Sequence, residues 1–451
     1  RYRINAFDWH AEFVDVFNDS NGFDAVIGNP PYIRMEAFKK LKIYLKTNYA
    51  CHDERSDLYA YFIERAHKLL NEHGRFGMIV SNKFLRANYG KPLRDYLGQH
   101  AAIEGIVDFA GLPVFKGATV RTIVLLTSPK TNDSQPLLYS PPMAVDKFAA
   151  IESGSLAIEN AIAETTYEVS STALAQPVWS FVKREADDFL SRINAECQPL
   201  KAYCDGKIFM GIKSGLTEAF VIEGQQRAAI LQANPKADEI IKPFLNGRDV
   251  RRYLLESKNI FLIYTYHGIN IAEYPGVEQH LKIFKDRLKN RVTRQEWYEL
   301  QQPQYNYKIY LDGPKIIFPD IATAPRFAFD ENGFYCSNTV YFIPRHDLYL
   351  LGLLNSKLAC FYFRTVCAGL EGKTETYLRF FGQYLEGFPV AVRPTESPMI
   401  LKVSSLVERM LALHRQLATA KIPTDKIVPQ RQIEATDRQI DGLVYELYGL
   451  T

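Results

Sequence analysis

The 451-residue chain lacks the features of a membrane or secreted protein. It has no apolar run near the ~20 residues that a membrane-spanning helix needs, and its start does not resemble a secretory leader. Its six cysteines form no C-x-x-C pair and none of the spacings that hold zinc. We therefore expect a cytoplasmic protein with reduced thiols, without a membrane partner and without a metal site.

An excess of charge of one sign is also missing. The chain has 54 basic and 51 acidic residues, and its net charge of +3 is too small to identify a nucleic-acid partner. Internal repeats and low-complexity tracts are absent, which excludes repeat architectures. With 47% hydrophobic and 23% charged residues, the composition predicts a globular protein with a large core, and the length predicts two domains.

A glycine-rich turn between a strand and a helix, which marks many nucleotide cofactor sites, does not precede the strand expected at residues 24–28. The chain starts at Arg1 and reaches this strand almost at once. A central parallel strand needs hydrogen-bonded neighbours on both sides, and the downstream segments supply only part of a sheet. These observations predict that the chain is the C-terminal part of a longer polypeptide.

The sequence is organised around the motif Asn29-Pro30-Pro31-Tyr32, which follows the apolar segment Ala25-Val26-Ile27 and Gly28. Such a segment is typical of a parallel strand that is buried on both faces. The glycine and the two prolines favour a sharp and stiff exit from the strand. We expect the motif at the carboxyl edge of a sheet, where open α/β sheets bind ligands.

The residue types of this motif fit the methylation of an exocyclic amine. The Asn29 side chain and the Pro30 carbonyl offer two acceptors for amino hydrogens, and Pro30 has no N–H that would compete. Two acceptors leave the nitrogen lone pair free to attack, and Tyr32 can stack on a planar ring swung out of a duplex. The plainer alternative is a strand that ends in a Pro-Pro turn with a surface Asn and Tyr.

Hydrophobic periodicity predicts half of a doubly wound α/β sheet, followed by an α+β unit. The first part has a helix at 57–70, a strand at 75–80, a helix at 91–97 and strands at 103–109 and 120–127. Turn-rich segments then interrupt this order between residues 128 and 176. The second part has strands at 207–222, 259–266 and 315–319, a hairpin of 326–329 with 335–343, and helices at 348–363, 400–418 and 431–447.

With these elements placed, the chain resembles the adenine-N6 DNA methyltransferases of the TaqI and Eco57I type, which include fused type IIG restriction-modification enzymes. Asn29-Pro30-Pro31-Tyr32 is similar to their catalytic motif, which protein-glutamine and RNA methyltransferases share. Residues 57–62 and 114–118 are similar to two further catalytic-domain motifs. Similarity to the specificity domain and to the ending of type IIG chains lies in residues 241–250, 327–330, 335–339, 353–358 and 441–450.

The resemblance implies a division of the chain into three parts. Residues 1–130 would be the C-terminal part of a Rossmann-like methyltransferase domain, and residues 131–176 a linker. Residues 177–451 would be an α+β target-recognition domain that ends in helices.

The resemblance also assigns roles to single residues. The catalytic residues would be Asn29, Pro30, Pro31 and Tyr32, with Phe115 on the other side of the flipped base. S-adenosylmethionine would contact Asn29, Phe62 and Asn5, which falls where the family commonly has an acidic residue. For Phe62 and Phe115 the alternative is simple core packing.

Two basic stretches of the recognition domain are predicted to contact DNA, mainly through phosphates. They contain Arg248, Arg251, Arg252, Lys285, Lys289 and Arg291. Solvated helix faces are the alternative reading of such runs. The implied partners are double-stranded DNA and an upstream segment or complementing chain that completes the cofactor site, and Mg²⁺ would be needed only by an upstream nuclease domain.

The sequence therefore predicts a site-specific DNA adenine methyltransferase of a restriction-modification system. A protein-glutamine or RNA methyltransferase is one alternative, although the large aromatic-rich C-terminal part counts against it. A non-catalytic or phage-defence DNA-binding protein of similar layout is another, although the retained motif argues against the loss of chemistry.

Overall fold

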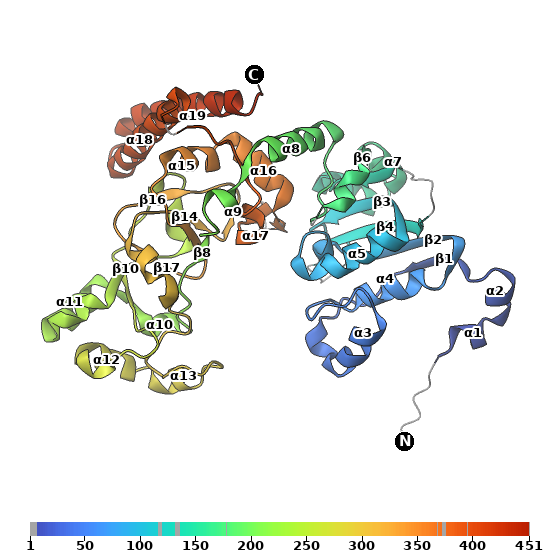
Figure 1. The fold of residues 1–451 in the computed structure, drawn as a ribbon, viewed down its shortest axis with the longest axis horizontal. Helices are drawn as coiled ribbons and strands as arrows, with labels where there is room; N and C mark the ends of the chain where they lie inside the picture. Colours follow the sequence, from blue (N-terminus) through green and yellow to red (C-terminus); the bar gives the residue numbers. More distant parts are fainter. Residues whose placement is uncertain are drawn as a thin grey trace. The chain divides into compact units, whose positions relative to one another are not determined.

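The computed structural model describes residues 7–115, 120–130, 136–176, 178–367, 369–371, 376–394 and 396–450. The chain forms two compact units, which we call unit 1 (up to Leu190) and unit 2 (from Ser191). The helix α8 (Arg184–Glu196) carries the chain from one to the other (Figure 1). None of the helices in the described residues combines the length and the apolar character needed to traverse a bilayer.

Unit 1 is built on a sheet with the strand order β1-β2-β4-β3-β5-β6. The strands are β1 (Phe23–Gly28), β2 (Leu70–Ser81), β3 (Ala101–Ala110), β4 (Thr122–Pro129), β5 (Leu137–Ser140) and β6 (Tyr167–Val169). β1 is parallel to β2 and β3 is parallel to β5, whereas β4 and β6 are antiparallel to their neighbours. Four of the six strands run in one direction, so the predicted α/β sheet is confirmed.

β1 lies at the edge of this sheet and pairs only with β2 among the described residues. Its side chains are exposed or half-buried, and Ile27 is 85% exposed. The expectation of a strand buried on both faces is therefore wrong for this structure, because the side chains on the faces of β1 are left uncovered by the described residues.

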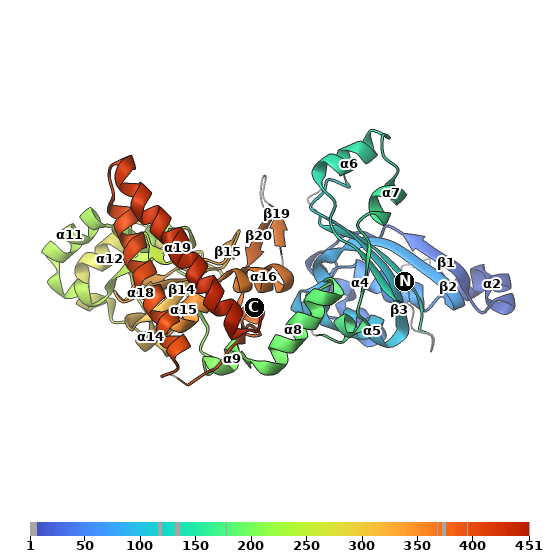
Figure 2. The same ribbon diagram turned by 90° about the horizontal axis from the view of Figure 1, so that it is seen from above.

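Helices pack on the sheet and around its end. They are α1 (Trp9–Glu12), α2 (Val14–Asp19), α3 (Lys42–Asn48), α4 (Tyr59–His67), α5 (Lys91–His100), α6 (Val145–Glu152) and α7 (Ile158–Ala163). Ile63 of α4 and Leu97 of α5 share one core with Phe76, Ile106 and Leu125 of the sheet. α6 and α7 form a lobe that projects beyond the sheet (Figure 2).

Two predicted boundaries in unit 1 differ from the structure. The helix predicted at residues 57–70 ends at His67, because Leu70 already pairs with Phe23 as the start of β2. The segment predicted as a linker, residues 131–176, contributes β5 and β6 to the sheet, and α6 and α7 lie between these strands. The contacts therefore place the end of unit 1 near Leu190 instead of residue 176.

Unit 2 contains several small sheets. The two larger ones have the orders β17-β10-β13-β9 and β16-β14-β18-β8, and the smaller ones are β15-β20-β19, β11-β12 and β21-β7. Their strands are β7 (Gln198–Pro199), β8 (Phe209–Met210), β9 (Val221–Glu223), β10 (Ile241–Leu245), β11 (Val250–Arg251), β12 (Leu254–Leu255), β13 (Ile260–Ile263), β14 (Lys315–Pro319), β15 (Ile321–Ala322), β16 (Ala328–Asp330), β17 (Tyr335–Cys336), β18 (Val340–Ile343), β19 (Gly369–Glu371), β20 (Thr376–Arg379) and β21 (Pro389–Val390).

The hairpin predicted for residues 326–329 and 335–343 is wrong. β16 and β18 both pair with β14, on its two sides, and β17 joins β10 in the other sheet. The Asp330 carboxylate accepts the N–H groups of Asn332 and Phe334, which folds the chain after β16 into a local turn. The strand predicted at residues 207–222 is also broken, because Gly211 approaches the Ser337 carbonyl too closely for any Cβ and Gly215 has a φ of +81°.

The helices of unit 2 are α9 (Leu200–Tyr203), α10 (Thr217–Phe220), α11 (Gly224–Ala233), α12 (Pro275–Lys282), α13 (Lys285–Lys289), α14 (Lys308–Asp312), α15 (Leu348–Leu354), α16 (Lys357–Val366), α17 (Gly382–Leu385), α18 (Pro398–Thr419) and α19 (Pro423–Leu447). The single helix predicted at 348–363 is two helices, because Ser356 caps α16 by accepting the Ala359 N–H at 3.2 Å. α18 and α19 lie side by side as a helical hairpin in both views (Figures 1 and 2).

A buried ion pair joins β14 and β16 in the core of unit 2. The Lys315 Nζ lies 2.6 Å from Asp330 Oδ2, and both side chains are fully buried. Lys315 also donates to the carbonyls of Leu311 and Gly313, at 2.7 and 3.2 Å. Each charge is therefore fully partnered, and the loss of either partner would leave the other buried and unpaired.

We expect Asp330→Ala to lower the free energy of unfolding by about 3–5 kcal/mol, the usual cost of breaking a buried pair. Glu331→Ala is the matched control, because Glu331 forms an exposed ion pair with Arg415 at 3.6 Å, and such pairs contribute about 0–1 kcal/mol. Urea unfolding followed by circular dichroism measures both variants. Equal and small losses would contradict the role of the buried pair.

Candidate active site and DNA-contacting residues

The motif Asn29-Pro30-Pro31-Tyr32 leaves the carboxyl end of β1. Pro30 is buried, whereas Asn29 and Pro31 are exposed, so the Asn29 amide is accessible at the end of the strand. The Ile33 carbonyl accepts the Leu58 N–H at 2.8 Å, which ties the exit of the motif to the start of α4. The motif therefore lies at a sheet edge, with its polar group turned toward solvent.

Tyr32 is half-buried and is fixed at its far end. Its hydroxyl donates to the Ile79 carbonyl of β2 at 2.8 Å. Burial raises the pKa of Tyr32 to about 12, so the phenol stays protonated and keeps this hydrogen bond at neutral pH. The ring lies against the buried Tyr59, with 6.3 Å between the ring centroids.

The Phe115 ring is the second aromatic neighbour of Tyr32. The centroids are 5.9 Å apart and the ring planes are tilted by 58°. A sandwiched base needs about twice the ~3.4 Å spacing of stacked bases. A base would therefore have to move the rings apart by about 1 Å and turn them parallel.

The loop that carries Phe115 is held at its start and from the side. Ala110 has a positive φ of 47°, and its N–H donates to the Asp108 carboxylate at 2.7 Å. Leu112 and Val114 pack with Met143 and with side chains of α6 in a small apolar cluster. The following residues of the predicted motif, 116–118, lie outside the described residues.

Of the three residues predicted to contact the cofactor, Asn29 is the exposed residue of the motif described above, and Phe62 and Asn5 have different outcomes. Phe62 is 43% exposed although its neighbours Tyr61 and Ile63 on α4 are buried, so the structure does not support the alternative of core packing. The Phe62 ring is therefore accessible, and its contact with the adenine of S-adenosylmethionine stays a prediction. Asn5 lies outside the described residues.

Sequence reasoning missed Ile79, which fixes the Tyr32 ring, and Asp108 and Met143, which hold the loop that carries Phe115. Ile79 acts through its backbone carbonyl and Met143 through packing, so their identities carry no recognisable signal. Asp57, the first residue of the predicted helix at 57–70 and of the motif at 57–62, has a carboxyl pKa that burial raises and that the nearby Lys83 and Arg34 lower in part. Groups of His, Cys, Asp or Glu able to hold a metal are absent from the described residues.

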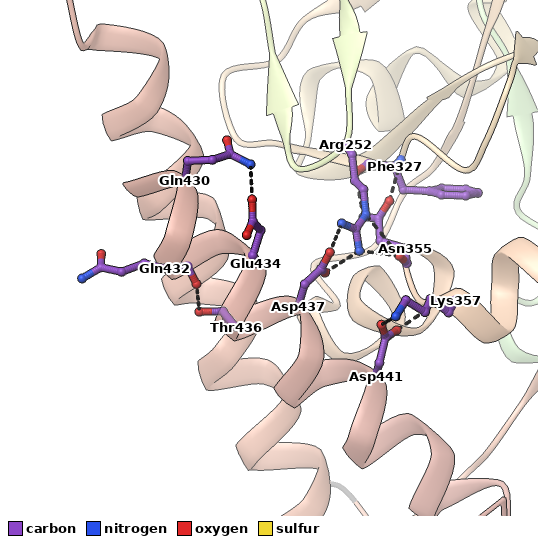
Figure 3. Close-up of polar contacts among 10 residues, drawn as sticks. All are labelled: Arg252, Phe327, Asn355, Lys357, Gln430, Gln432, Glu434, Thr436, Asp437 and Asp441. Carbon is purple, nitrogen blue, oxygen red and sulfur yellow. Dashed lines mark hydrogen bonds and ion pairs between the residues drawn. The ribbon is translucent and has the colours of Figure 1, made fainter. Parts of the chain in front are cut away.

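The three arginines after β10 lie in different surroundings. Arg248 is exposed and has no ion pair among the described residues. Arg251 pairs with Glu256 at 3.1 Å near the surface. Arg252 points into the unit and donates to the Asn355 carbonyl and to both oxygens of Asp437 on α19 (Figure 3). The prediction that Arg252 contacts DNA is thus corrected, because its guanidinium is hydrogen-bonded to Asp437 and Asn355 and fixes α19 to the rest of the unit.

The second basic stretch is also mixed. Lys289 is exposed, and Lys285 lies 5.0 Å over the ring of Trp297. The Arg291 guanidinium donates to backbone carbonyls of unit 2, including those of Glu299 at 2.8 Å and Trp297 at 3.0 Å. A DNA contact by Arg291 is therefore not supported, whereas Arg248, Arg251, Lys285 and Lys289 stay predictions.

Comparison with known proteins matches each part of the chain to a family. Residues 1–115 match the Eco57I restriction-modification methylase family, and residues 242–390 match the TaqI-like C-terminal specificity domain. The type II methyltransferase M.BstVI of Geobacillus stearothermophilus is 24% identical over 80% of this chain and 66% of its own length. The type II restriction enzyme and methyltransferase RM.Eco57I of Escherichia coli is 22% identical over 95% of this chain and 46% of its own length.

A solved structure has a similar fold. The type IIL restriction-modification enzyme MmeI in complex with DNA superposes with a TM-score of 0.64 at 14% identity, over 97% of this chain and 56% of that chain. The chain thus spans between about half and two thirds of the length of these relatives. The first part of the chain is thus similar to Eco57I restriction-modification methylases and the second part to TaqI-like C-terminal specificity domains.

Proposed function

We propose that the protein methylates N6 of adenine in double-stranded DNA, with S-adenosylmethionine as the methyl donor, as part of a restriction-modification system. The observation that carries the proposal is the placement of Asn29 and Pro30 at a sheet edge, next to the neighbouring rings of Tyr32 and Phe115. The relatives named as type II methyltransferases support methyl transfer within a restriction-modification system.

The residues of the motif supply positioning and hydrogen-bond acceptors. The Asn29 side-chain oxygen and the Pro30 carbonyl accept the two amino hydrogens of a flipped adenine, which leaves the nitrogen lone pair directed outward. S-adenosylmethionine, when bound, supplies the electrophilic methyl group. The N6 proton of the product passes to solvent, since the methylated ammonium is acidic and needs no strong base. Most of the rate enhancement then comes from orientation and fixed dipoles.

The two rings compensate for taking the base out of the duplex. Unstacking costs a few kcal/mol, and each aromatic contact to a base contributes roughly 1–3 kcal/mol. Because the Tyr32 hydroxyl is bonded to Ile79, we propose that Tyr32 stays fixed and that Phe115 moves to admit the base.

The cofactor site is completed, in our proposal, by a segment upstream of this chain or by a complementing chain. The exposed outer edge of β1 and the exposed Phe62 ring support this, because a further parallel strand could pair with β1 and cover Ile27. The naming of RM.Eco57I as both restriction enzyme and methyltransferase supports an additional nuclease region, which would use Mg²⁺.

Asn29→Ala in the full-length protein is expected to lower methylation by roughly 10²–10³-fold, the usual effect of losing one fixed hydrogen-bonding group. Duplex affinity should change little, because Asn29 would contact the flipped base and the cofactor but no other part of the duplex. Asn88→Ala is the control, since Asn88 is also an exposed asparagine of unit 1. Sequencing that detects N6-methyladenine in host DNA measures the modification and its sites.

The same measurement tests the proposed reaction itself. Wild-type protein that leaves host DNA without N6-methyladenine, but methylates protein glutamine or RNA, would overturn the proposed substrate. Asn29→Ala protein with wild-type turnover would overturn the catalytic role of the motif.

Tyr32→Phe is expected to keep the stacking ring but lose its hydrogen bond to Ile79, which contributes about 0.5–1.5 kcal/mol. We expect a fall in methylation of less than tenfold, whereas Tyr32→Ala should reduce it far more because one face of the base loses its contact. 2-Aminopurine fluorescence at the target position reports base flipping in both variants. Equal flipping by Tyr32→Ala and wild-type protein would show that the ring does not hold the base.

A further inference from the structure

Residues 283–294, which we call the basic arm, project from unit 2 after α12. They include α13 and lie at the end of the unit opposite the α18–α19 hairpin in Figure 1. Together with Lys282 this stretch has six basic side chains and one acidic side chain, Asp286. The arm therefore concentrates positive charge in a chain whose net charge is only +3.

Arg291 anchors the C-terminal part of the arm to the body of unit 2. Its Nε donates to the Leu288 carbonyl at 2.9 Å. The two terminal nitrogens donate to four further carbonyls, those of Ser214, Glu299, Glu296 and Trp297, at 2.8–3.2 Å. All five N–H groups of the guanidinium are thus used, and its Cζ atom lies 5.6 Å from the centroid of the Phe220 ring. Such a contact set fixes the backbone on both sides of residue 291.

The next residue, Val292, is 100% exposed, and Ile283 at the start of the arm is 76% exposed. A single exposed apolar residue is ordinary. Val292, however, lies between Arg291, whose five hydrogen bonds fix the backbone, and Arg294, two positions later. The exposed Val292 side chain is therefore held outward, with a basic residue on either side in the sequence.

The cations of the arm differ in how they are compensated. Lys282 pairs with Glu278 at 2.8 Å, and Arg287 pairs with Glu218 at 2.6 Å. Lys289 and Arg294 are exposed and have no ion pair among the described residues. Glu296 is the exposed acid nearest in sequence to Arg294. Lys289 and Arg294 are therefore the two charges on either side of Val292 that are available to a partner.

We propose that the basic arm grips duplex DNA, with Lys289 and Arg294 on phosphates and Val292 inside a groove against sugars and base edges. The proposal rests on the proposed function, which makes DNA the partner. Uncompensated cations fit a phosphate backbone because binding releases condensed counterions. An apolar tip between them fits groove walls, where apolar side chains of other DNA-binding proteins insert. Arg291 in this arrangement positions the arm and does not itself touch DNA.

Fluorescence anisotropy with a labelled ~30-base-pair duplex, over a series of salt concentrations, tests the contact in the full-length protein. We expect Lys289→Gln and Arg294→Gln each to weaken binding severalfold and to reduce the salt slope by about one, as the loss of one phosphate contact does. The double variant should lose about two. Lys402→Gln and Lys426→Gln are matched controls, because both lysines are exposed on the α18–α19 hairpin.

Val292 needs a different readout, since it carries no charge. Val292→Ser should weaken binding with an unchanged salt slope, and Val292→Asp should weaken it further, because a carboxylate would face phosphates. Val428→Ser on α19 is the control, as Val428 is 58% exposed. All these substitutions are at exposed positions and leave the fold intact. Arg291→Gln is not used as a test, because it is expected to loosen the arm itself.

The outcomes separate the two proposals. If wild-type protein binds the duplex and the Lys289 and Arg294 double variant binds with the same affinity and slope, the arm is not a DNA contact, and the proposed function stands. Binding that depends on the two cations but not on Val292 would overturn the groove insertion. A wild-type protein that binds no duplex would overturn both proposals.

Discussion

The hydrogen bond from the Tyr32 hydroxyl to the Ile79 carbonyl holds the candidate site to the protein core. β1 alone could not do this, because it is an edge strand with exposed side chains. Pro30 and Pro31 have no N–H groups, so the middle of the motif offers no backbone donor that could fix it. The remaining backbone tie is the bond from the Leu58 N–H to the Ile33 carbonyl. Both hydrogen bonds connect the motif to elements that contribute to the buried core, β2 and α4. The motif is therefore held rigid by these two elements.

The sequence was sufficient to locate the motif, the helix α5 and the central strand β14, because each has a strong local pattern. It failed where tertiary contacts override local pattern. Leu69 and Leu70 continue the apolar spacing of α4, yet Leu70 pairs with β1. Residues 326–343 alternate like a hairpin, yet β17 joins a different sheet after the turn formed by Asp330. Likewise, the site is supported by the Ile79 carbonyl and the Met143 side chain. Both come from segments that are distant in sequence and are brought to the site only when the chain folds.

The arginines of unit 2 show that the role of a basic residue is also decided by tertiary contacts and not by the local sequence. Arg248, Arg252 and Arg291 lie in similar basic stretches of the sequence. In the structure Arg252 binds Asp437, Arg291 binds backbone carbonyls, and Arg248 is exposed. A guanidinium has five donors in a fixed plane, so it satisfies several carbonyls or a carboxylate as readily as phosphates. Basic residues in a recognition domain are therefore divided between framework and surface by geometry that the sequence does not encode locally.

The contact between the Tyr32 and Phe115 rings gives a physical reason for joining two units in one chain. In the absence of a base, the Tyr32–Phe115 contact contributes about 0.5–1.5 kcal/mol. A base entering the site replaces that contact with two contacts of roughly 1–3 kcal/mol each, against an unstacking cost of a few kcal/mol. These terms nearly cancel, so unit 1 alone would flip a base weakly and with little selectivity. For the proposed reaction, the remaining free energy must come from contacts to the surrounding duplex. A specificity domain is the part of the chain suited to supply it, because phosphate and groove contacts form only where the duplex fits.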